Sequence, residues 1–329
     1  MNILLIGFGS IGSRHLKNIL ALGYKNVAVV SSTKKLPEEI SSLKAYKNIK
    51  EAVSSSKFDA AIVCTPTAQH ISNVIELLQH NIKNIYLEKP ISNNYNKISD
   101  VLQVMQEKNA RIIVGYDLRF DPGLQKLKEL ITRKIVGKPI SINAIVGQYL
   151  PDWRPHQDYT KSMSAKIETG GGVMLDLIHE FDYLYWLIGD VKTIAAQYIH
   201  SNSLNIETED AAEVLLKFEN NVIGTIHLDY LQPALVRHCM ITCTNGSIFW
   251  DTNLSEVKCI NQNKETFYFS YKDFKRNDRF IQIVKTFLED KKDERLTTFN
   301  EGLKSLKMVL AAKQSSEQQK FIQLNQENF

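Results

Sequence analysis

Short apolar runs alternate with longer segments of helical periodicity over the first 120 residues of the chain. The runs are typical of strands buried on both faces, and they lie at residues 2–6, 26–30, 58–64, 84–87 and 111–116. Between them, apolar residues recur three or four positions apart, as over 11–22 and 98–107, which indicates amphipathic helices. This alternation predicts a doubly wound parallel sheet, and ligands bind such sheets beyond the carboxyl ends of the strands.

The pattern changes after about residue 121. Helical periodicity over 124–134 and 173–188 flanks a strand-like run at 140–146 and a polar, aromatic stretch at 148–169. Further strand-like runs follow at 191–199, 211–218, 222–230, 237–244 and 247–250, and helical segments at 273–289 and 300–317 end the pattern. We therefore predict two domains, residues 1–120 and 121–329. The second is an α/β domain with an open, largely antiparallel sheet, whose last helix could pack back on the first domain.

A glycine-rich turn directly follows the first apolar run. The sequence Gly7-Phe8-Gly9-Ser10-Ile11-Gly12 matches G-x-G-x-x-G between a strand and a helix, the context in which the motif indicates dinucleotide binding. Gly7 would permit the tight turn, Gly9 would let the backbone approach a pyrophosphate, and Gly12 would let the helix pack closely. A glycine turn of some other α/β protein is the alternative. The context favours a Rossmann domain whose helix N-terminus binds phosphates.

The second strand-like run ends without the acidic residue that often binds the ribose hydroxyls of NAD. Ser31, Ser32 and Lys34 stand there instead. Hydroxyls and cations suit the 2′-phosphate of NADP, although Lys34 is equally compatible with a solvated loop charge. We therefore predict NAD(P) as the cofactor, with a mild lean to NADP.

Other polar groups follow the carboxyl ends of later strands. They are Thr65-Pro66-Thr67 with His70, then Glu88-Lys89-Pro90, and finally the segment from Tyr116 to Arg119. Because these ends meet at one edge of a parallel sheet, we expect these groups to line one crevice with the glycine turn. An ammonium at Lys89 could hold or protonate an oxygen on a carbon that exchanges hydride. An exposed loop lysine is the alternative.

Asp176 and His179 follow Gly170-Gly171-Gly172 in a predicted helix. A spacing of three would place both side chains on one helix face among apolar neighbours. A carboxylate beside an imidazole suits a proton relay or a clamp on a sugar diol. A satisfied buried pair and a zinc site are the alternatives. No third ligand has a compelling spacing, so we predict no metal.

Composition narrows the class of protein further. The net charge of +4 includes no basic stripe interleaved with aromatics, so we predict no nucleic-acid partner. No apolar run reaches the ~20 residues that span a bilayer, and the first run lacks the basic start of a signal peptide. Cysteines 64, 239, 243 and 259 show no C-x-x-C spacing. We expect buried free thiols in a cytoplasmic protein.

Four motifs together resemble the glucose–fructose oxidoreductase / inositol dehydrogenase / rhizopine catabolism (Gfo/Idh/MocA) family. They are the turn 7–12, Thr65–His70, Glu88-Lys89-Pro90, and 170–176 with His179. The resemblance covers nearly the whole chain. It implies a Rossmann domain, an α/β domain whose open sheet often forms a dimer or tetramer interface, and NAD(P)-dependent oxidation or reduction of a sugar or cyclitol carbon. By match, Lys89 takes the role of the catalytic lysine. Asp176 and His179 match the pair that orients the substrate hydroxyl and passes its proton.

The chain departs from the family pattern at two positions. The family's common spacing is Asp-x-x-x-His, whereas Asp176-x-x-His179 would rotate the histidine by about 100° on a regular helix. Either the helix starts differently or the proton role has shifted. Asp117 stands where relatives often carry asparagine, and it could bind a polar substrate or perturb Lys89. The stretch 149–155 is similar to a branch found with bacterial surface-polysaccharide enzymes, which implies a nucleotide-activated or acidic sugar.

The sequence therefore predicts an NAD(P)-dependent oxidoreductase that acts on a CH–OH carbon of a sugar, cyclitol or nucleotide sugar. Trp153 and Tyr159 could stack on a sugar or base, and Arg154 could bind a carboxylate or phosphate. A structured linker is the alternative for that stretch. The predicted substrate residues are these three with Asp117 and Arg119. A glycosidase that retains NAD without net redox change and a non-catalytic dinucleotide sensor are the alternative functions.

Overall fold

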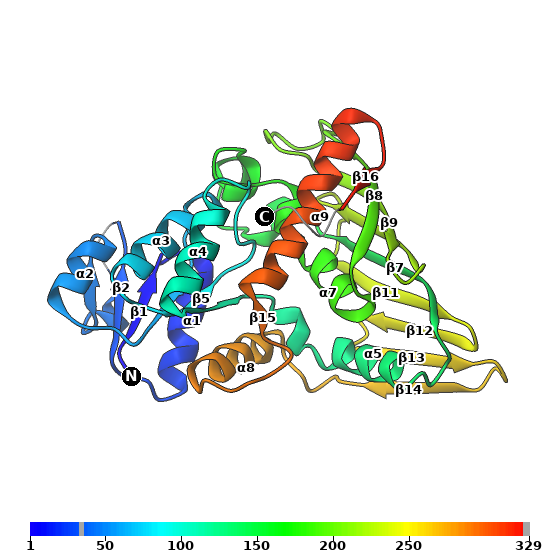
Figure 1. Cartoon of the computed structure of the whole chain (residues 1–329), viewed down its shortest axis with the longest axis horizontal. Helices are drawn as coiled ribbons and strands as arrows, with labels where there is room; N and C mark the ends of the chain where they lie inside the picture. The colour runs from blue at the N-terminus through cyan, green and yellow to red at the C-terminus, as the bar shows by residue number, and fades with distance from the viewer. Residues whose placement is uncertain (33–35, 325–329) are drawn as a thin grey trace. The chain divides into compact units, whose positions relative to one another are not determined.

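The computed structural model describes residues 1–32 and 36–324 of the chain (Figure 1). Contacts divide the chain into two compact units. The first comprises Met1–Asp117 and Arg276–Leu303, and the second comprises Leu118–Lys275 and the chain from Lys304 onward. The predicted boundary at residue 120 lies close to the first crossing, but the segment 276–303 returns to the first unit.

The sheet of the first unit has the strand order β15-β6-β5-β4-β1-β2-β3 within the described residues. Its strands are β1 (Ile3–Ile6), β2 (Val27–Val30), β3 (Lys44–Tyr46), β4 (Ala60–Val63), β5 (Asn84–Leu87), β6 (Arg111–Val114) and β15 (Thr297–Thr298). Within residues 1–32 and 36–324, all pairings in this sheet are parallel except that of β15 with β6. Every residue of β1, β2 and β4 is buried, which explains their unbroken apolar runs. The strand order reverses between β1 and β4, and ligands bind open α/β sheets at such a point.

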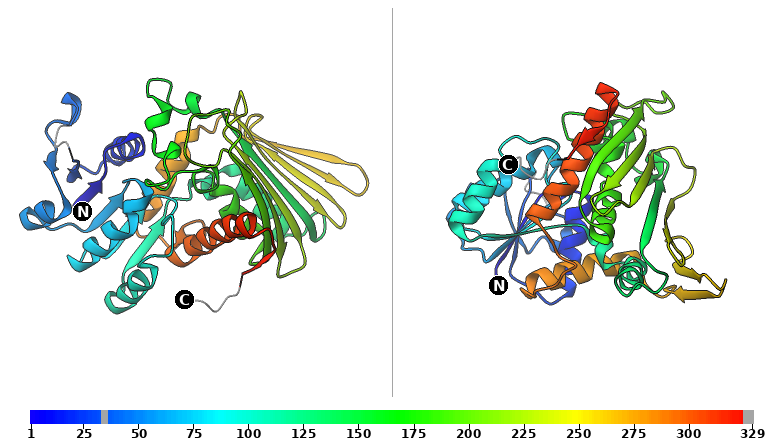
Figure 2. Two further views of the ribbon diagram at one scale, coloured as in Figure 1. Left: turned by 90° about the horizontal axis from the view of Figure 1, so that it is seen from above. Right: turned by 45° about the vertical axis from the view of Figure 1, so that its right-hand side comes forward.

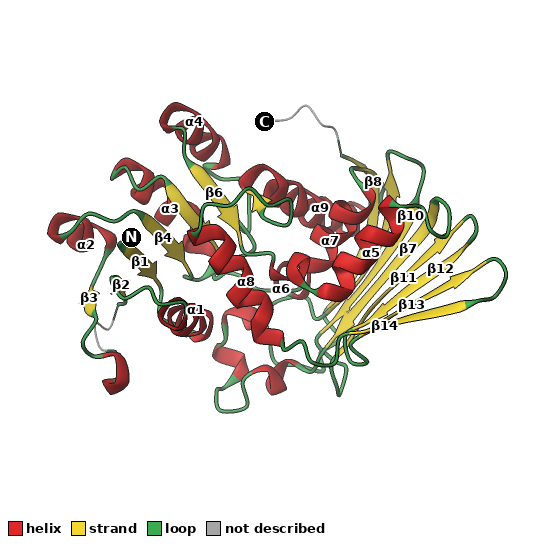
Figure 3. Cartoon of the chain, turned by 90° about the horizontal axis from the view of Figure 1, so that it is seen from below, coloured by secondary structure: helices red, strands yellow, loops and turns green. Residues whose placement is uncertain are grey.

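Helices cover both faces of this sheet (Figure 3). They are α1 (Ser10–Ala21), α2 (Ile49–Ser55), α3 (His70–Gln79), α4 (Ile98–Lys108) and α8 (Arg276–Leu288). The pairs α1–α8 and α3–α4 pack against each other. Helix α8 buries Phe280, Ile283 and Phe287, and Asn18 and Asn277 exchange amide hydrogen bonds of 3.3 and 2.9 Å. These contacts explain why a helix distant in sequence belongs to the first unit.

The second unit contains an open, largely antiparallel sheet, as predicted. Its strand order is β14-β13-β12-β11-β7-β10-β9-β8-β16 among the residues that the structure describes. The strands are β7 (Pro139–Gly147), β8 (Val191–Ile199), β9 (Ala211–Phe218), β10 (Ile223–Asp229), β11 (Val236–Cys243), β12 (Gly246–Asp251), β13 (Glu256–Asn261), β14 (Thr266–Ser270) and β16 (Ile322–Gln323). Only the pairing of β10 with β7, within this described part, is parallel.

The helices of the second unit pack on one face of this sheet (Figures 1 and 2). They are α5 (Pro122–Thr132), α6 (Val173–Asp176), α7 (His179–Ile188) and the greater part of α9 (Phe299–Gln318). The start of α9 has a capping box, because the main-chain N–H of Thr298 donates to Glu301 Oε2 at 2.9 Å and the main-chain N–H of Glu301 donates to Thr298 Oγ1 at 3.3 Å. On the opposite face of the sheet, Leu215, Ile223 and Met240 are each more than two-fifths exposed.

His227 lies on that opposite face between two carboxylates. Its Nδ1 is 2.6 Å from Glu213 Oε1, and its Nε2 is 2.9 Å from Asp229 Oδ2. The hydrogen bond with Asp229, followed by the interactions with Glu213, raises the pKa of His227 to about 9. A histidine whose pKa is raised in the folded state stabilises the fold fully below its unfolded pKa of about 6.5, and this stabilisation is lost as the pH rises toward about 9.

We expect His227→Gln to lower the free energy of unfolding by about 1 kcal/mol near pH 6, allowing for solvent screening, and to have little effect near pH 10. Urea unfolding at the two pH values measures this difference. His238→Gln on β11, where the histidine packs on Phe249, is the matched control on the same sheet. An equal pH dependence in the two variants would contradict the assigned role of the carboxylates.

Candidate active site

The glycine turn that joins β1 to α1 is tightly packed at Gly7 and Gly12 and has open space at Gly9. Gly7 has a φ of +89°, and a Cβ there would lie 2.7 Å from the carbonyl oxygen of Cys64. A Cβ on Gly12 would lie 2.1 Å from the carbonyl oxygen of Gly7. A Cβ on Gly9 would meet no described atom within 4 Å. The fold therefore requires glycine at positions 7 and 12, and the turn leaves room beside Gly9.

Helix α1 begins at Ser10 with an N-terminus suited to an anion. Its N-cap is Gly9, and within the described residues no side chain caps it and no acidic residue stands in its first turn. The first N–H groups of a helix and the positive end of its dipole attract phosphates. Together with the room beside Gly9, this N-terminus fits the pyrophosphate of a dinucleotide.

The other predicted cofactor residues of the first unit lie at the carboxyl ends of its strands. Ser31 directly follows β2, and its N–H donates to the carbonyl of Tyr46 at 3.0 Å. Ser32 is exposed, whereas Lys34 lies outside the described residues. Pro66 is partly exposed and Thr67 is buried. Asn73 Nδ2 donates to Thr65 Oγ1 at 2.9 Å and so orients that hydroxyl after β4.

His70 supports the main chain in this region. Its Nδ1 is 2.7 Å from the carbonyl oxygen of Pro90, and its Nε2 is 2.9 Å from that of Thr65. The ring is 1% exposed, and burial lowers its pKa. His70 therefore links the segment after β4 to the segment after β5, and this placement argues against the direct cofactor contact that the sequence predicts.

Glu88 and Lys89 directly follow β5. Glu88 is 7% exposed, and its Oε1 is 2.6 Å from Nε2 of His15 in α1. Its Oε2 accepts the main-chain N–H of Lys89 at 3.3 Å. Lys89 is partly exposed, at the same edge of the sheet as the glycine turn. The sheet thus brings an ammonium and a dinucleotide-type turn to one edge of a single unit.

Asp117 is placed differently from the prediction. It is 4% exposed and forms an ion pair with Arg279 of α8, with Nε 3.0 Å from Oδ2. Sequence reasoning missed this partner because it lies far along the chain. A buried carboxylate that is already paired with an arginine is poorly placed to bind substrate.

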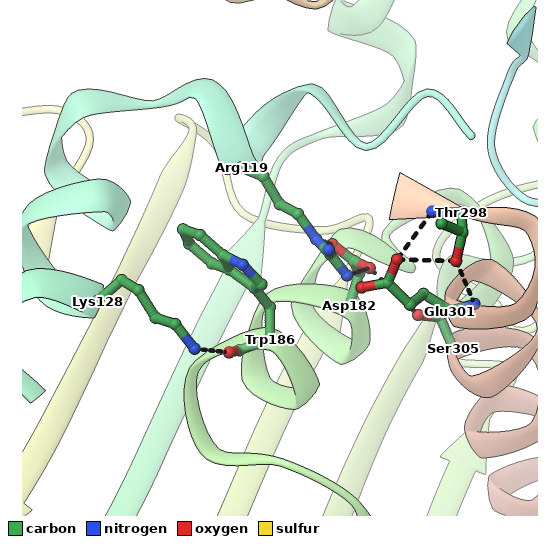
Figure 4. A network of polar contacts seen from close by, with 7 residues as sticks. All are labelled: Arg119, Lys128, Asp182, Trp186, Thr298, Glu301 and Ser305. Carbon is green, nitrogen blue, oxygen red and sulfur yellow. Dashed lines mark hydrogen bonds and ion pairs between the residues drawn. The ribbon is translucent and has the colours of Figure 1, made fainter. Parts of the chain in front are cut away.

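Arg119 is also inside its unit. Its guanidinium is fully buried and forms two hydrogen bonds with Asp182 of α7, Nε to Oδ2 at 2.9 Å and Nη2 to Oδ1 at 2.8 Å (Figure 4). The guanidinium also lies 5.8 Å from the ring centroid of Trp186. This ion pair joins the start of the second unit to α7, and it argues against the predicted contact of Arg119 with substrate.

The helix that carries Asp176 and His179 is broken between them, contrary to the prediction. Helix α6 ends at Asp176 and α7 begins at His179. Leu177 has φ −98° and ψ 28°, and the N–H of Glu180 bonds to the carbonyl of Leu177 rather than one residue earlier. The argument that both side chains share one helix face therefore does not hold. The two side chains are 8% and 9% exposed.

Tyr230, which sequence reasoning missed as a site residue, holds Asp176. Its hydroxyl donates to Asp176 Oδ2 at 2.7 Å, and its ring packs edge-on against Trp153 at 5.4 Å. Burial, and then the charge of Asp176, raise the pKa of Tyr230 well above its usual value. The hydroxyl thus stays protonated and keeps its donor. The only signal in the sequence was its position at the end of an apolar run.

Glu209 holds the start of α6. The turn before it needs glycine, because Gly172 has a φ of +112° and a Cβ there would lie 2.5 Å from Glu209 Oε1. The main-chain N–H of Met174 donates to the same carboxylate at 3.4 Å, and Lys313 of α9 pairs with it at 3.0 Å. This buried acid fixes the turn that presents Asp176. The sequence offered no pattern that indicated it.

The remaining predicted substrate residues lie in the loop after β7. Trp153 Nε1 donates to the carbonyl of Gln148 at 3.2 Å, and Trp153 reaches Tyr230 as described above. The hydroxyl of Tyr159 accepts the main-chain N–H of Asn205 at 3.3 Å. Arg154 is partly exposed. Of the loop residues, Trp153 therefore joins the cluster around Asp176.

The four cysteines are buried free thiols, as predicted, and burial raises the pKa of Cys239 and Cys243 above the usual thiol value. Within the described part of the chain, no helix is long and apolar enough to cross a membrane. No group of three or more histidine, cysteine or acidic residues there is arranged to hold a metal ion.

Two family models match the chain. One, described as an oxidoreductase family with an NAD-binding Rossmann fold, matches residues 1–116, and the GFO/IDH/MocA C-terminal domain matches residues 124–249. Among curated proteins, a myo-inositol 2-dehydrogenase of Thermotoga maritima is 25% identical, and the alignment covers 99% of each chain. An uncharacterized oxidoreductase of Bacillus subtilis is also 25% identical, over 94% of this chain and 93% of its own.

Solved structures share the fold. An NAD-binding oxidoreductase from Klebsiella pneumoniae superposes with a TM-score of 0.86 at 17% identity, over 99% of this chain and all of its own. The WlbA dehydrogenase from Bordetella pertussis, solved with NADH and UDP-GlcNAcA, gives 0.82 at 20% identity, over 99% of both chains. The predicted fold class, the predicted NAD-binding Rossmann domain and the oxidoreductase class are confirmed. The chain belongs to the Gfo/Idh/MocA family of oxidoreductases.

Proposed function

We propose that this protein transfers hydride between NAD(P) and a CH–OH carbon of a sugar, cyclitol or nucleotide sugar. The observation that carries the proposal is the edge of the first sheet, where Lys89 follows β5 and the open side of the glycine turn follows β1. In the second unit, Asp176, Tyr230 and Trp153 form a connected cluster, and Asp176 lies three residues before His179. Family membership supports the same reaction class.

Different side chains would move the proton, orient the reacting groups and hold the orienting residue in place. When bound, a nicotinamide dinucleotide supplies the acceptor or donor of hydride. Oxidation of a CH–OH group also releases a proton from its oxygen, and Lys89 and His179 are the groups that hold or move that proton. Asp176 orients the imidazole or the substrate hydroxyl, and Tyr230 fixes Asp176 by its 2.7 Å hydrogen bond.

The dinucleotide would lie along the carboxyl ends of the first sheet. The turn at Gly9 and the first N–H groups of α1 suit its pyrophosphate. Ser31, Ser32 and Lys34 follow β2, where a ribose is bound in Rossmann domains. The absence of an acid there favours NADP, and that preference stays a prediction, as does a role for Lys34.

Trp153 and Arg154 are the residues we propose for substrate recognition. The ring of Trp153 offers a stacking surface beside the Asp176 cluster, and a guanidinium at Arg154 can bind a carboxylate or a phosphate in a forked geometry. The solved relative from Bordetella pertussis contains UDP-GlcNAcA, which carries such groups. A sugar linked to a nucleotide or bearing an acid is therefore the first substrate class to test.

Turnover on a panel of sugars, cyclitols and nucleotide sugars, followed by the absorbance of reduced cofactor, tests the proposal. We expect net formation or consumption of NADH or NADPH with at least one member. Tight cofactor binding without net absorbance change, but with cleavage of a glycoside, would replace the proposal by a redox-neutral glycosidase. Binding without any conversion across the panel would favour a dinucleotide sensor.

We further propose that copies of the chain associate through the uncovered face of the second sheet, as a dimer or tetramer. Leu215 of β9, Ile223 of β10 and Met240 of β11 are exposed on that face, with β7 between β10 and β11, and exposed apolar side chains on an uncovered sheet face are typical of an interface. Light scattering should give a mass above that of one chain, and Leu215→Glu should lower it.

We retain the cytoplasm as the predicted location because the thiols are unpaired.

A further inference from the structure

We propose that His15 is a positioning residue for Lys89. Its imidazole holds the Glu88 carboxylate inside the first unit, and Glu88 in turn holds the main chain from which Lys89 projects. The inference rests on the proposed role of Lys89 in proton transfer. It adds a helix residue outside the glycine motif to the machinery of the reaction.

The position of the His15 ring is fixed from several sides. His15 lies in the second turn of α1 and is fully buried. The ring meets Tyr86 edge-on at 5.2 Å and Phe280 at 6.1 Å between centroids. Aromatic neighbours on two elements leave the ring little freedom to rotate away from Glu88.

The hydrogen bond between His15 and Glu88 has a defined direction. Nδ1 of His15 is buried and has no hydrogen-bond partner among the described residues, whereas Nε2 is 2.6 Å from Glu88 Oε1. We therefore assign the proton to Nε2, because a buried N–H without an acceptor costs more than a buried lone pair. The imidazole donates and the carboxylate accepts.

Main-chain and side-chain atoms surround the carboxylate of Glu88 closely. A Cβ added to Gly115, at the end of β6, would lie 3.1 Å from Glu88 Oε1 and 2.8 Å from the hydroxyl of Tyr86. The second carboxylate oxygen accepts the main-chain N–H of Lys89. His15 at 2.6 Å, with a longer contact from the Tyr86 hydroxyl at 3.5 Å, thus anchors one oxygen of Glu88, while the other oxygen accepts the main-chain N–H of Lys89.

A carboxylate buried in this way is costly for the fold, since an apolar pair of similar volume is often as stable or more so. Its retention next to Lys89 has a functional rationale. A carboxylate that is held at a fixed place in a poorly solvated site keeps a constant distance from, and a constant effect on, a neighbouring ammonium. Loss of the anchor would let the carboxylate turn toward the ammonium.

Two nearly isosteric variants separate the hydrogen bond from packing. Gln at position 15 retains a donor near the position of Nε2, and Met has a similar length without a donor. We expect His15→Met to lower kcat by about 10- to 100-fold and to move the limb of the pH profile that Lys89 sets by about half a unit or more toward alkaline pH. His15→Gln should stay near the wild type in both respects.

A readout independent of turnover follows Lys89 itself. Reductive methylation with ¹³C-formaldehyde labels lysines, and the Lys89 resonance is identified by its loss in Lys89→Arg. Its titration midpoint should move in His15→Met but not in His15→Gln. Asn18→Ala, which removes another buried side chain of α1, is the control and should leave the midpoint unchanged.

Equal pH profiles and equal Lys89 titrations in the Gln and Met variants would overturn the inference and leave His15 as a packing residue. Failure of the proposed function is a separate result, because Lys89→Ala would then retain turnover in the same assay. If Met at position 15 prevents folding, His15→Leu, which also lacks a donor, replaces it with the same expected outcomes.

Discussion

Replacing Lys89 by alanine is expected to lower kcat by about 10³-fold or more while the Kd for reduced cofactor changes little. The ammonium acts on the oxygen of the reacting carbon, so its loss removes an interaction made most strongly in the transition state. Dinucleotide binding depends instead on the turn at Gly9 and the start of α1. Steady-state kinetics on the substrate found in the panel, together with fluorescence titration of the cofactor, measure both quantities.

Lys83→Ala is the matched control for this prediction. Lys83 is an exposed lysine immediately before β5, whereas Lys89 follows the carboxyl end of the same strand. The control should leave kcat and cofactor binding near their wild-type values. Full turnover in Lys89→Ala with normal cofactor binding would show that another group handles the proton.

Two glycine substitutions in the turn should both weaken cofactor binding but differ in their effect on stability. Gly9→Ala places a methyl group where the structure has open space, so we expect only a small loss of Tm, from alanine at the N-cap of α1, and cofactor binding weakened by about tenfold or more, because the methyl occupies the approach of the pyrophosphate. Gly12→Ala drives a Cβ to 2.1 Å from the carbonyl oxygen of Gly7, so we expect destabilisation of about 3 kcal/mol as well as lost binding.

Thermal unfolding and fluorescence titration of both variants measure these effects. Ser13→Ala, in the following turn of α1, is the control and should change neither quantity appreciably. If Gly9→Ala bound NADH and NADPH as tightly as the wild type, the turn would not be the pyrophosphate site. A normal Tm in Gly12→Ala would show that α1 can shift away from β1.

The regular part of the fold could be predicted because its signals are local. Central strands such as β1 and β4 are buried on both faces and read as continuous apolar runs. Strands β3, β15 and β16 have only two or three residues each, too few to show a period. Strand β14 is largely exposed, so its pattern lacks a buried face.

The candidate site could be predicted only where motif and position coincide. Lys89 and the glycine turn depend on short segments at strand ends, and the structure places them there. The pairings of Arg119 with Asp182 and Asp117 with Arg279 join residues far apart in sequence, and no local pattern specifies them. A charged residue that the sequence suggests for substrate binding can therefore already be engaged in an internal ion pair.

The break between α6 and α7 shows a second limit. Apolar residues run through Leu177 and Ile178 with helical spacing, so periodicity predicts one continuous helix. Leu177, with φ −98° and ψ 28°, lies outside the helical range of dihedral angles, so Asp176 and His179 belong to separate helices. The shortened Asp-x-x-His spacing thus spans a break between two helices, and the rotation expected on one regular helix does not apply to it.

The most direct test of the central claim is a fluorescence titration of the purified protein with NADH and NADPH. The account predicts saturable binding of at least one of them at micromolar to sub-millimolar concentration, with affinity reduced in Gly9→Ala and retained in Lys89→Ala. Binding of neither cofactor to the folded protein would contradict the assignment of residues 7–12 as a dinucleotide site, and with it the proposed reaction.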